Sequence, residues 1–188
     1  MTKYKPLLMI RRLKWTNITT TGPNSPPPVG WYICWPAVPL KIRLRRPISP
    51  AEYLELYALV GDLWLWRDRL VWSEDELARY LASPDVYVWS AHLEGGTAGY
   101  FELRQHTDRT VELMYFGLAP AFIGRGLGGW LLTRAAHEAF ALGAPRIVLN
   151  TCTLDAPQAL PNYLARGFTI VSEDQYLLDV PAKTAPAP

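Results

Sequence analysis

The chain has 188 residues, of which 49% are hydrophobic and 19% are charged, with a net charge of +2. That length suits one domain with a sizeable core, and its 8 Trp, 10 Tyr and 5 Phe exclude a mostly disordered chain. Two cysteines, Cys34 and Cys152, exclude a disulfide-stapled scaffold and indicate reduced thiols in a cytoplasmic protein. With only 3 His and no CxxC or HxxxH pair, the sequence predicts no metal site.

Charge is distributed unevenly along the chain. Residues 1–51 contain nine Lys or Arg and no acid, whereas residues 52–188 contain 10 basic and 17 acidic residues, a net charge of −7. A basic arm can tether nucleic acid, but these residues form two short clusters, and we favour an arm that lies on the acidic body or stays solvated. The longest uncharged run, residues 15–40, contains six prolines, so we expect no membrane span either.

The first predicted elements follow an extension. Residues 1–28 are basic and rich in proline, so we expect an N-terminal extension, a single domain over residues 29–181 and a disordered tail over residues 182–188. Strands are predicted over residues 29–35 and 40–45, the second because polar and apolar residues alternate. Ser49, Pro50 and Glu52 form the start signal of a helix that ends at Gly61.

The later elements alternate between hairpins and helices. A helix follows Ser73 and runs to Leu81, and a hairpin joins strands 86–93 and 97–105. The strand over residues 110–118 is almost entirely apolar, so we expect it at the centre of the sheet. Then come a helix over 126–142, a strand over 146–151, a helix over 157–166 with Asp155 as its N-cap, and strands over 168–172 and 176–180. This order predicts the α/β (α+β) class with a mixed sheet.

The most informative stretch is Val111–Leu132, in which an apolar strand runs through a glycine-rich loop into a helix. Backbone N–H groups can converge in such a loop, and the helix N-terminus adds partial positive charge, so the pattern predicts a pyrophosphate cradle. The alternative is a loop whose glycines only let helix and strand pack closely. A Walker loop is excluded because Gly128-Gly129-Trp130 stands where Gly-Lys-Ser/Thr is required, and a dinucleotide fold would place its loop early in the chain.

At this point the sequence resembles the GNAT family of acyl-CoA-dependent N-acyltransferases. Residues 123–128, IGRGLG, are similar to the family signature Gln/Arg-x-x-Gly-x-Gly/Ala, with Ile123 at the first position. Residues 163–168, YLARGF, are similar to the family's Tyr-x-x-x-Gly-Phe, and the chain also resembles a bacterial subgroup with FIGRGLG and TCTLD…LPNYLARGF elements. The resemblance covers about residues 40–180. It implies a mixed, mostly antiparallel central sheet flanked by helices, with an extra N-terminal segment.

The resemblance also implies roles for individual residues. The backbone of Phe116, Gly117 and Leu118 would hold the pantetheine arm and the thioester of acetyl-CoA, the expected cosubstrate. The pyrophosphate would be held by Ile123, Gly124, Arg125, Gly126, Leu127, Gly128 and Gly129. Glu112 stands where many family members place a general base, and Tyr163 stands where they place a general acid.

The proposed chemistry requires a base and an acid. A lysine-like amine has an ordinary pKa of ~10.4, so a carboxylate such as Glu112, directly or through water, must take its proton before attack. A leaving thiolate gains from a phenol donor such as Tyr163. Glu112 could instead be a solvated edge carboxylate, and Tyr163 a core tyrosine. Cys152 is interpreted as a strand-end residue rather than a nucleophile, because direct attack on the thioester needs none.

The acceptor side carries a weaker signal. Trp64 and Trp66 could form the wall of a substrate pocket, or they could be aromatic packing beneath a helix pair. The three histidines, His92, His106 and His137, have no partners at catalytic spacing and are interpreted as surface or structural residues. We predict transfer of acetyl to a primary amine on a small molecule or peptide by a monomer or homodimer. The alternatives are a non-catalytic acyl-CoA-binding or sensing domain and a nucleic-acid-associated module that uses the basic arm.

Overall fold

A computed structural model describes residues 8–17 and 40–178 of the chain. Its seven strands form one sheet in the order β2-β3-β4-β5-β6-β1-β7, so β5 is central as predicted. Neighbouring strands run antiparallel except for β5 and β6, which are parallel. The strands are β1 (Leu8–Asn17), β2 (Lys41–Leu44), β3 (Val86–Leu93), β4 (Gly96–Gln105), β5 (Val111–Leu118), β6 (Ile147–Cys152) and β7 (Phe168–Leu178).

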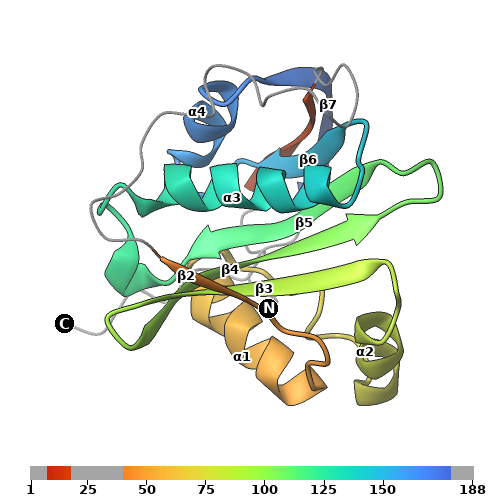
Figure 1. Ribbon diagram of the computed structural model, residues 1–188. Coiled ribbons are helices and arrows are strands. Elements are labelled where there is room, and N and C mark those ends of the chain that lie inside the picture. The colour runs from red at the N-terminus through yellow and green to blue at the C-terminus, as the bar shows by residue number, and fades with distance from the viewer. Residues whose placement is uncertain (1–7, 18–39, 179–188) are drawn as a thin grey trace, which may run out of the picture.

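Helices cover both faces of the sheet (Figure 1). On one face, α1 (Pro50–Gly61) and α2 (Glu74–Leu81) enclose a core that contains Tyr53, Leu77 and Tyr100. On the other face, α3 (Leu127–Ala141) and α4 (Ala159–Leu164) enclose a second core around Phe101 and Leu131. Two 3-10 turns, η2 (Asp62–Trp64) and η3 (Pro120–Phe122), follow α1 and β5. The predicted class and the helix-flanked sheet are confirmed, and no helix among the described residues is both long and apolar enough to cross a bilayer.

The local start signals form as predicted at both helices of the first face. The Ser49 hydroxyl accepts a hydrogen bond from the Glu52 N–H at 3.3 Å, and the Glu52 carboxylate accepts one from the Ser49 N–H at 3.1 Å. Ser73 and Glu76 form the same reciprocal pair before α2. Each pair satisfies backbone donors that a helix start leaves without partners, so these boundaries could be predicted from a few contiguous residues.

Two predictions about the ends of the chain are wrong. Leu8–Asn17 is not part of a separate extension: it forms β1, which lies between β6 and β7 in the sheet. The predicted break between strands 168–172 and 176–180 is also absent, because β1 pairs along β7 and places Arg12 opposite Asp174 in register. Pairing over about 160 residues leaves no local sequence signal. The rest of the predicted extension, the predicted strand over 29–35 and the predicted tail over 182–188 lie outside the described residues.

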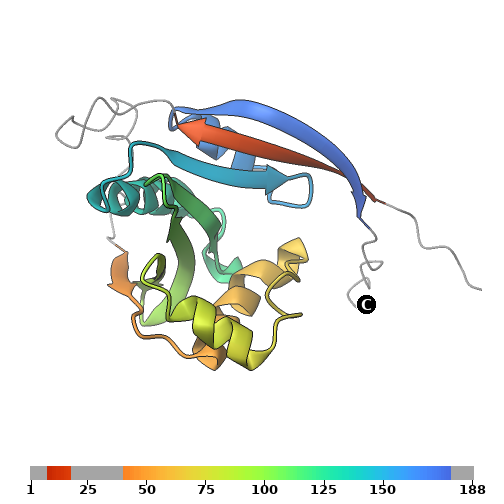
Figure 2. The same ribbon diagram turned by 90° about the vertical axis from the view of Figure 1, so that its right-hand side faces the viewer.

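The sheet divides at its centre. β5 and β6 pair only from Val111–Ile147 to Leu113–Leu149, and beyond that point the two strands diverge (Figure 2). The β4–β5 register shifts between Leu103–Leu113 and Glu102–Tyr115, so Met114 is a β-bulge at the same level. A bulge bends its strand and adds twist, which accounts for the divergence of β5 from β6. The divergence exposes one backbone edge of β5 in the middle of the sheet.

Candidate active site

The diverging end of β5 offers a backbone edge to a ligand. Among the residues that the structure describes, no strand pairs with the β6-facing N–H and C=O groups of β5 from Met114 to Leu118, while the other edge pairs with β4. An extended ligand can pair with such an edge as an added strand does. The predicted residues Phe116, Gly117 and Leu118 form this part of β5 and are half-buried. Gly99 lies directly behind them: a Cβ there would be 2.3 Å from the Gly117 carbonyl oxygen, so β4 and β5 approach too closely for any side chain.

The edge of β5 leads into the predicted phosphate cradle. Gly124 and Gly126 have φ values of +81° and +74°, and a Cβ built on either meets nothing within 4 Å. Leu127 then begins α3, whose first backbone N–H groups have no intrahelical acceptor. Left-handed glycines in open space before a helix N-terminus fit a pyrophosphate. One expected donor differs, because the Ile123 N–H already donates to the Pro120 carbonyl at 3.3 Å.

Arg125 is turned toward a carboxylate at the mouth of this cradle. Its Nη2 lies 2.7 Å from Oε1 of Glu94, in the turn between β3 and β4, and its Nη1 lies 3.4 Å from Oε2. This contact lowers the pKa of the Glu94 carboxyl group through the hydrogen bond and charge of Arg125. Both side chains are exposed, so the pair is weak and Arg125 can exchange Glu94 for a phosphate at small cost.

Replacing Glu94 with glutamine should therefore strengthen CoA binding. The change removes the competing carboxylate but leaves the cradle intact. The Kd for CoA should fall by up to about fivefold, because the improvement cannot exceed the free energy of one exposed ion pair. Isothermal titration with CoA measures it. Replacing Arg125 with glutamine should weaken binding, and an Arg125→Gln/Glu94→Gln double variant should show no gain over Arg125→Gln alone. Tighter binding in that double variant would show that Glu94 acts without Arg125.

The first turn of α3 is also held by an arginine that the sequence did not single out. The Arg166 Nε donates to the Gly129 carbonyl at 2.9 Å and to the Thr133 hydroxyl at 3.3 Å. A Cβ on Gly129 would lie 1.8 Å from the Arg166 guanidinium, so a side chain at this position would displace that guanidinium. Gly128 differs, since its Cβ would make an ordinary contact at 3.8 Å with Leu118. The two adjacent glycines therefore have different roles.

Tyr163 lies beside the open edge of β5. Its ring is 6.2 Å from that of Phe116 and 5.9 Å from that of Phe168, and the residue is buried. Burial, together with the nearby charge of Asp155, raises the pKa of the Tyr163 hydroxyl well above its ordinary value. The phenol therefore stays protonated at neutral pH, as an acid that protonates a thiolate must. Pro161 lies in the first turn of α4, where its missing N–H costs no helical bond.

Asp155 is not the N-cap of α4, which begins after Gln158. Its Oδ2 instead accepts hydrogen bonds from the Thr151 hydroxyl at 2.7 Å and the Cys152 N–H at 3.0 Å, closing the turn that follows β6. Burial raises the pKa of this carboxyl group, while hydrogen bonds from Thr151, Cys152 and the Trp66 side chain act in the opposite direction. The turn thus places a carboxylate between the acceptor-side tryptophan and Tyr163. Cys152 ends β6, as predicted, but it is half-buried rather than buried.

Glu112 is held by two side chains from different elements. Its Oε2 lies 3.0 Å from Nε2 of His106, in the β4–β5 turn, and its Oε1 accepts a hydrogen bond from Asn150 Nδ2 on β6 at 3.0 Å. Val111 and Leu113 belong to the core beneath α3, so strand alternation turns Glu112 toward the face of α1 and α2. The expectation that His106 has no partner is wrong. Only the fold could bring β6 and the hairpin turn to Glu112.

One of the two tryptophans predicted to form the wall of the acceptor pocket, Trp66, packs in the hydrophobic core. The Trp66 ring packs against Tyr57, Tyr100 and Tyr115 at centroid distances of 5.5, 6.3 and 5.1 Å. A Cβ on Gly61 would be 2.4 Å from that ring, so the end of α1 is shaped around it. Trp66 therefore packs beneath α1 and also reaches Asp155. Trp64 lies in η2 and is half-buried.

A buried ion pair anchors the loop that carries Trp66. Arg69 Nη2 lies 3.4 Å from Oε1 of Glu102 at the centre of β4, with exposed fractions of 6% and 0%. Tyr53 donates to the same carboxylate at 2.5 Å, and Tyr80 also donates to it. The Arg69 guanidinium lies over three aromatic rings, those of Trp72, Tyr80 and Tyr115. Within the described part of the chain, no three His, Cys, Asp or Glu residues gather as metal ligands would.

Comparison with known proteins assigns the fold and its family. Over 97 residues the chain is 33% identical to a mycothiol acetyltransferase of Corynebacterium aurimucosum, covering 47% of this chain and 31% of that protein. It is 29% identical over 105 residues to the mycothiol acetyltransferase of Corynebacterium glutamicum strain R, covering 53% of this chain and 35% of that protein. The chain thus spans about a third of the length of these curated relatives.

Solved structures share the fold at low identity. An aminoglycoside acetyltransferase from an uncultured soil metagenomic sample, in complex with trehalose, superposes with a TM-score of 0.56 at 17% identity, covering 68% of this chain and 86% of that one. A Bacillus subtilis acetyltransferase in complex with CoA gives 0.52 at 23% identity, covering 69% and 76%. A sequence model of the acetyltransferase (GNAT) family matches residues 54–168, from α1 to the start of β7. With that match over more than half its length, the chain belongs to the acetyltransferase (GNAT) family.

Proposed function

We propose that the protein transfers an acetyl group from acetyl-CoA to a primary amine by direct attack of the amine on the thioester. The observation that carries this proposal is the open edge of β5, which runs from Met114 to Leu118 and leads into the glycine cradle at the start of α3. A strand edge suits the amide groups of pantetheine, and the cradle suits its pyrophosphate. The CoA complex of the Bacillus subtilis fold neighbour supports the choice of carrier.

In this proposal each proton has a named residue. An acceptor that arrives as an ammonium gives one proton to Glu112, directly or through water, and its nitrogen then attacks the thioester carbonyl carbon. The new C–N bond forms as the C–S bond breaks, and Tyr163 donates a proton to the departing thiolate. The nitrogen then loses its second proton, which returns through water to the Tyr163 phenolate, and Glu112 releases its proton to solvent. Overall, ammonium and thioester become amide, thiol and one proton released to solvent.

The acceptor is proposed to be a small molecule or peptide that carries a cationic amine. Residues 52–188 have a net charge of −7, which favours a cation in the encounter. Relatives named for mycothiol and for aminoglycosides are in keeping with a small acceptor. The face of β5 that Glu112 shares with α1 and α2, lined by Trp66 and Tyr115, is the side from which we expect the acceptor to approach.

Thermal unfolding with acetyl-CoA, CoA, NAD and ATP tests the carrier first. A ligand at about 100 times its Kd should stabilise the fold by about 2.7 kcal/mol. We expect acetyl-CoA and CoA to raise the Tm, and NAD and ATP to leave it unchanged. A panel of primary amines, followed by thiol release, then tests transfer. CoA binding without transfer to any amine would favour an acyl-CoA-sensing domain, and no shift with either CoA compound would overturn the proposal.

A further inference from the structure

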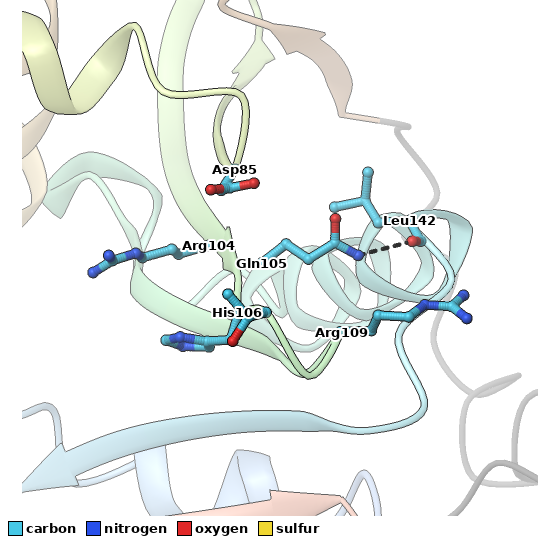
Figure 3. Close-up of a pocket in the computed structure, with 7 residues that line it drawn as sticks. Asp85, Arg104, Gln105, His106, Arg109 and Leu142 are labelled. Atoms are coloured by element: carbon cyan, nitrogen blue, oxygen red, sulfur yellow. Dashed lines mark hydrogen bonds between the residues drawn. The ribbon is translucent and has the colours of Figure 1, made fainter.

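His106 occupies a fixed position at the turn between β4 and β5. Its backbone N–H donates to the Thr110 carbonyl at 2.8 Å, and its carbonyl accepts from the Arg109 N–H at 2.8 Å. The residue lines a cavity of about 450 Å³ at this turn, where its ring extends to the same side as Arg104, while Arg109 extends to the other (Figure 3). The backbone hydrogen bonds fix the position of His106 in the turn. Its side chain is 38% exposed, so the imidazole is also in contact with water.

The contact with Glu112 determines which nitrogen of the neutral His106 ring carries the proton. An ionised carboxylate only accepts hydrogen bonds, so the neutral His106 ring must present its proton on Nε2, 3.0 Å from Oε2. Asn150 donates to the other oxygen, and the Glu112 side chain is only 19% exposed. Each carboxylate oxygen therefore has one fixed donor and one lone pair left. A base held in this way keeps a single orientation between turnovers.

Several charged groups surround this pair. Asp85, Arg104 and Arg109 line the same cavity as His106. Arg104 lies opposite Glu112 in the β4–β5 register, and its guanidinium lies 5.8 Å from the centre of the Tyr80 ring of α2. Asp108, in the same turn as His106, interacts with it electrostatically and pairs with Arg146 at 3.4 Å. The contact from β6, Asn150, is uncharged.

We propose that His106 is the positioning residue of the Glu112 base. This inference rests on the proposed function. The ring orients the carboxylate through the Nε2–H bond. Without this donor, Asn150 is the side chain that still holds the carboxylate. Transfer should therefore slow when the donor is removed, because the base no longer keeps one orientation.

Two variants of His106, assayed with one amine substrate, separate positioning from folding. His106→Gln keeps a side-chain donor for Glu112, whereas His106→Leu removes the donor. At pH 8 we expect His106→Gln to keep kcat within about threefold and His106→Leu to lose about tenfold, a fraction of what a general base contributes. KM for acetyl-CoA should not change in either variant.

His92→Gln is the matched control. His92 is a half-buried histidine on β3, and its Nε2 lies 2.8 Å from the Ser90 hydroxyl, away from Glu112. It should keep the wild-type kcat. The proposal is overturned if His106→Leu keeps full kcat at pH 8. Equal losses in both His106 variants would assign the ring a structural role and overturn it as well.

A measurement without turnover keeps this inference separate from the proposed function. The ¹⁵N shifts of the His106 ring report which nitrogen carries the proton. We expect Nε2–H in the neutral wild-type protein, and a proton on Nδ1 would overturn the contact on which the proposal rests. A wild-type protein with Nε2–H that binds CoA but acetylates no amine would instead contradict the proposed function.

Discussion

Glu112→Gln should lower kcat by about 10²–10⁴-fold, the usual contribution of a general base, with little change in CoA affinity. Glutamine has the same shape; its amide oxygen can accept from one of Asn150 and His106, and its NH₂ can donate to the other once that partner turns an acceptor atom toward it, so the site should keep its geometry while losing its proton acceptor. Initial rates at saturating acetyl-CoA, together with calorimetric titration of CoA, measure the two effects separately. Glu55→Gln, on the exposed face of α1, should behave as wild type.

Tyr163→Phe tests the other half of the same step. The phenyl ring keeps the packing against Phe116 and Phe168 but removes the proton donor, so kcat should fall while CoA binding persists. The loss should be smaller for a thioester whose thiol is more acidic, because a better leaving group needs less help from an acid. Unchanged turnover in both Glu112→Gln and Tyr163→Phe would remove both residues from the chemistry.

Arg69→Met should lower the free energy of unfolding by about 3–5 kcal/mol, because it leaves a buried carboxylate without its cation. Glu102 is fully buried on β4 and Arg69 is its ion-pair partner at 3.4 Å. Methionine keeps much of the packing against Trp72 and Tyr80, so the loss reports charge rather than volume. Urea unfolding followed by tryptophan fluorescence measures it.

The loss of unfolding free energy caused by Arg69→Met should increase as the pH rises. Burial raises the pKa of Glu102 above its ordinary value in the folded protein, and Arg69 acts against that rise. The folded state therefore binds this proton more tightly than the unfolded state does. Stability from such a group is fully present below the unfolded pKa of about 4.5 and is lost as pH rises through the folded value. Without Arg69 the folded pKa rises further, so Arg69→Met should be least harmful at acid pH and most harmful at pH 8.

Two controls make this prediction specific. Arg67→Met removes an exposed arginine from the same loop, where its pair with Asp62 is 3.5 Å long, and should change stability by less than about 0.5 kcal/mol. Arg69→Met/Glu102→Gln removes both charges and should be more stable than Arg69→Met alone at pH 8. Equal losses at pH 5 and pH 8 would show that Arg69 stabilises the protein through packing rather than charge.

The sequence alone predicted the features that contiguous residues encode. The helix starts at Ser49 and Ser73 depend on a hydroxyl and a carboxylate three residues apart, and the loop before α3 is recognised by its run of glycines. The long apolar strand β5 was predicted at the centre of the sheet for the same kind of reason. The family followed from two motifs, in residues 123–128 and 163–168, each contained within six positions.

Tertiary structure alone decided which distant groups meet. Leu8–Asn17 became the strand between β6 and β7, Asn150 met Glu112, and Arg69 reached Glu102 from a loop 33 residues earlier. None of these contacts has a local pattern, because the partners are joined by backbone pairing and core packing rather than by spacing along the chain. Neighbouring residues determine the loops and the motifs, so the sequence is enough to predict them. The surroundings of Glu112 form only when β4, β5 and β6 lie side by side in the folded sheet.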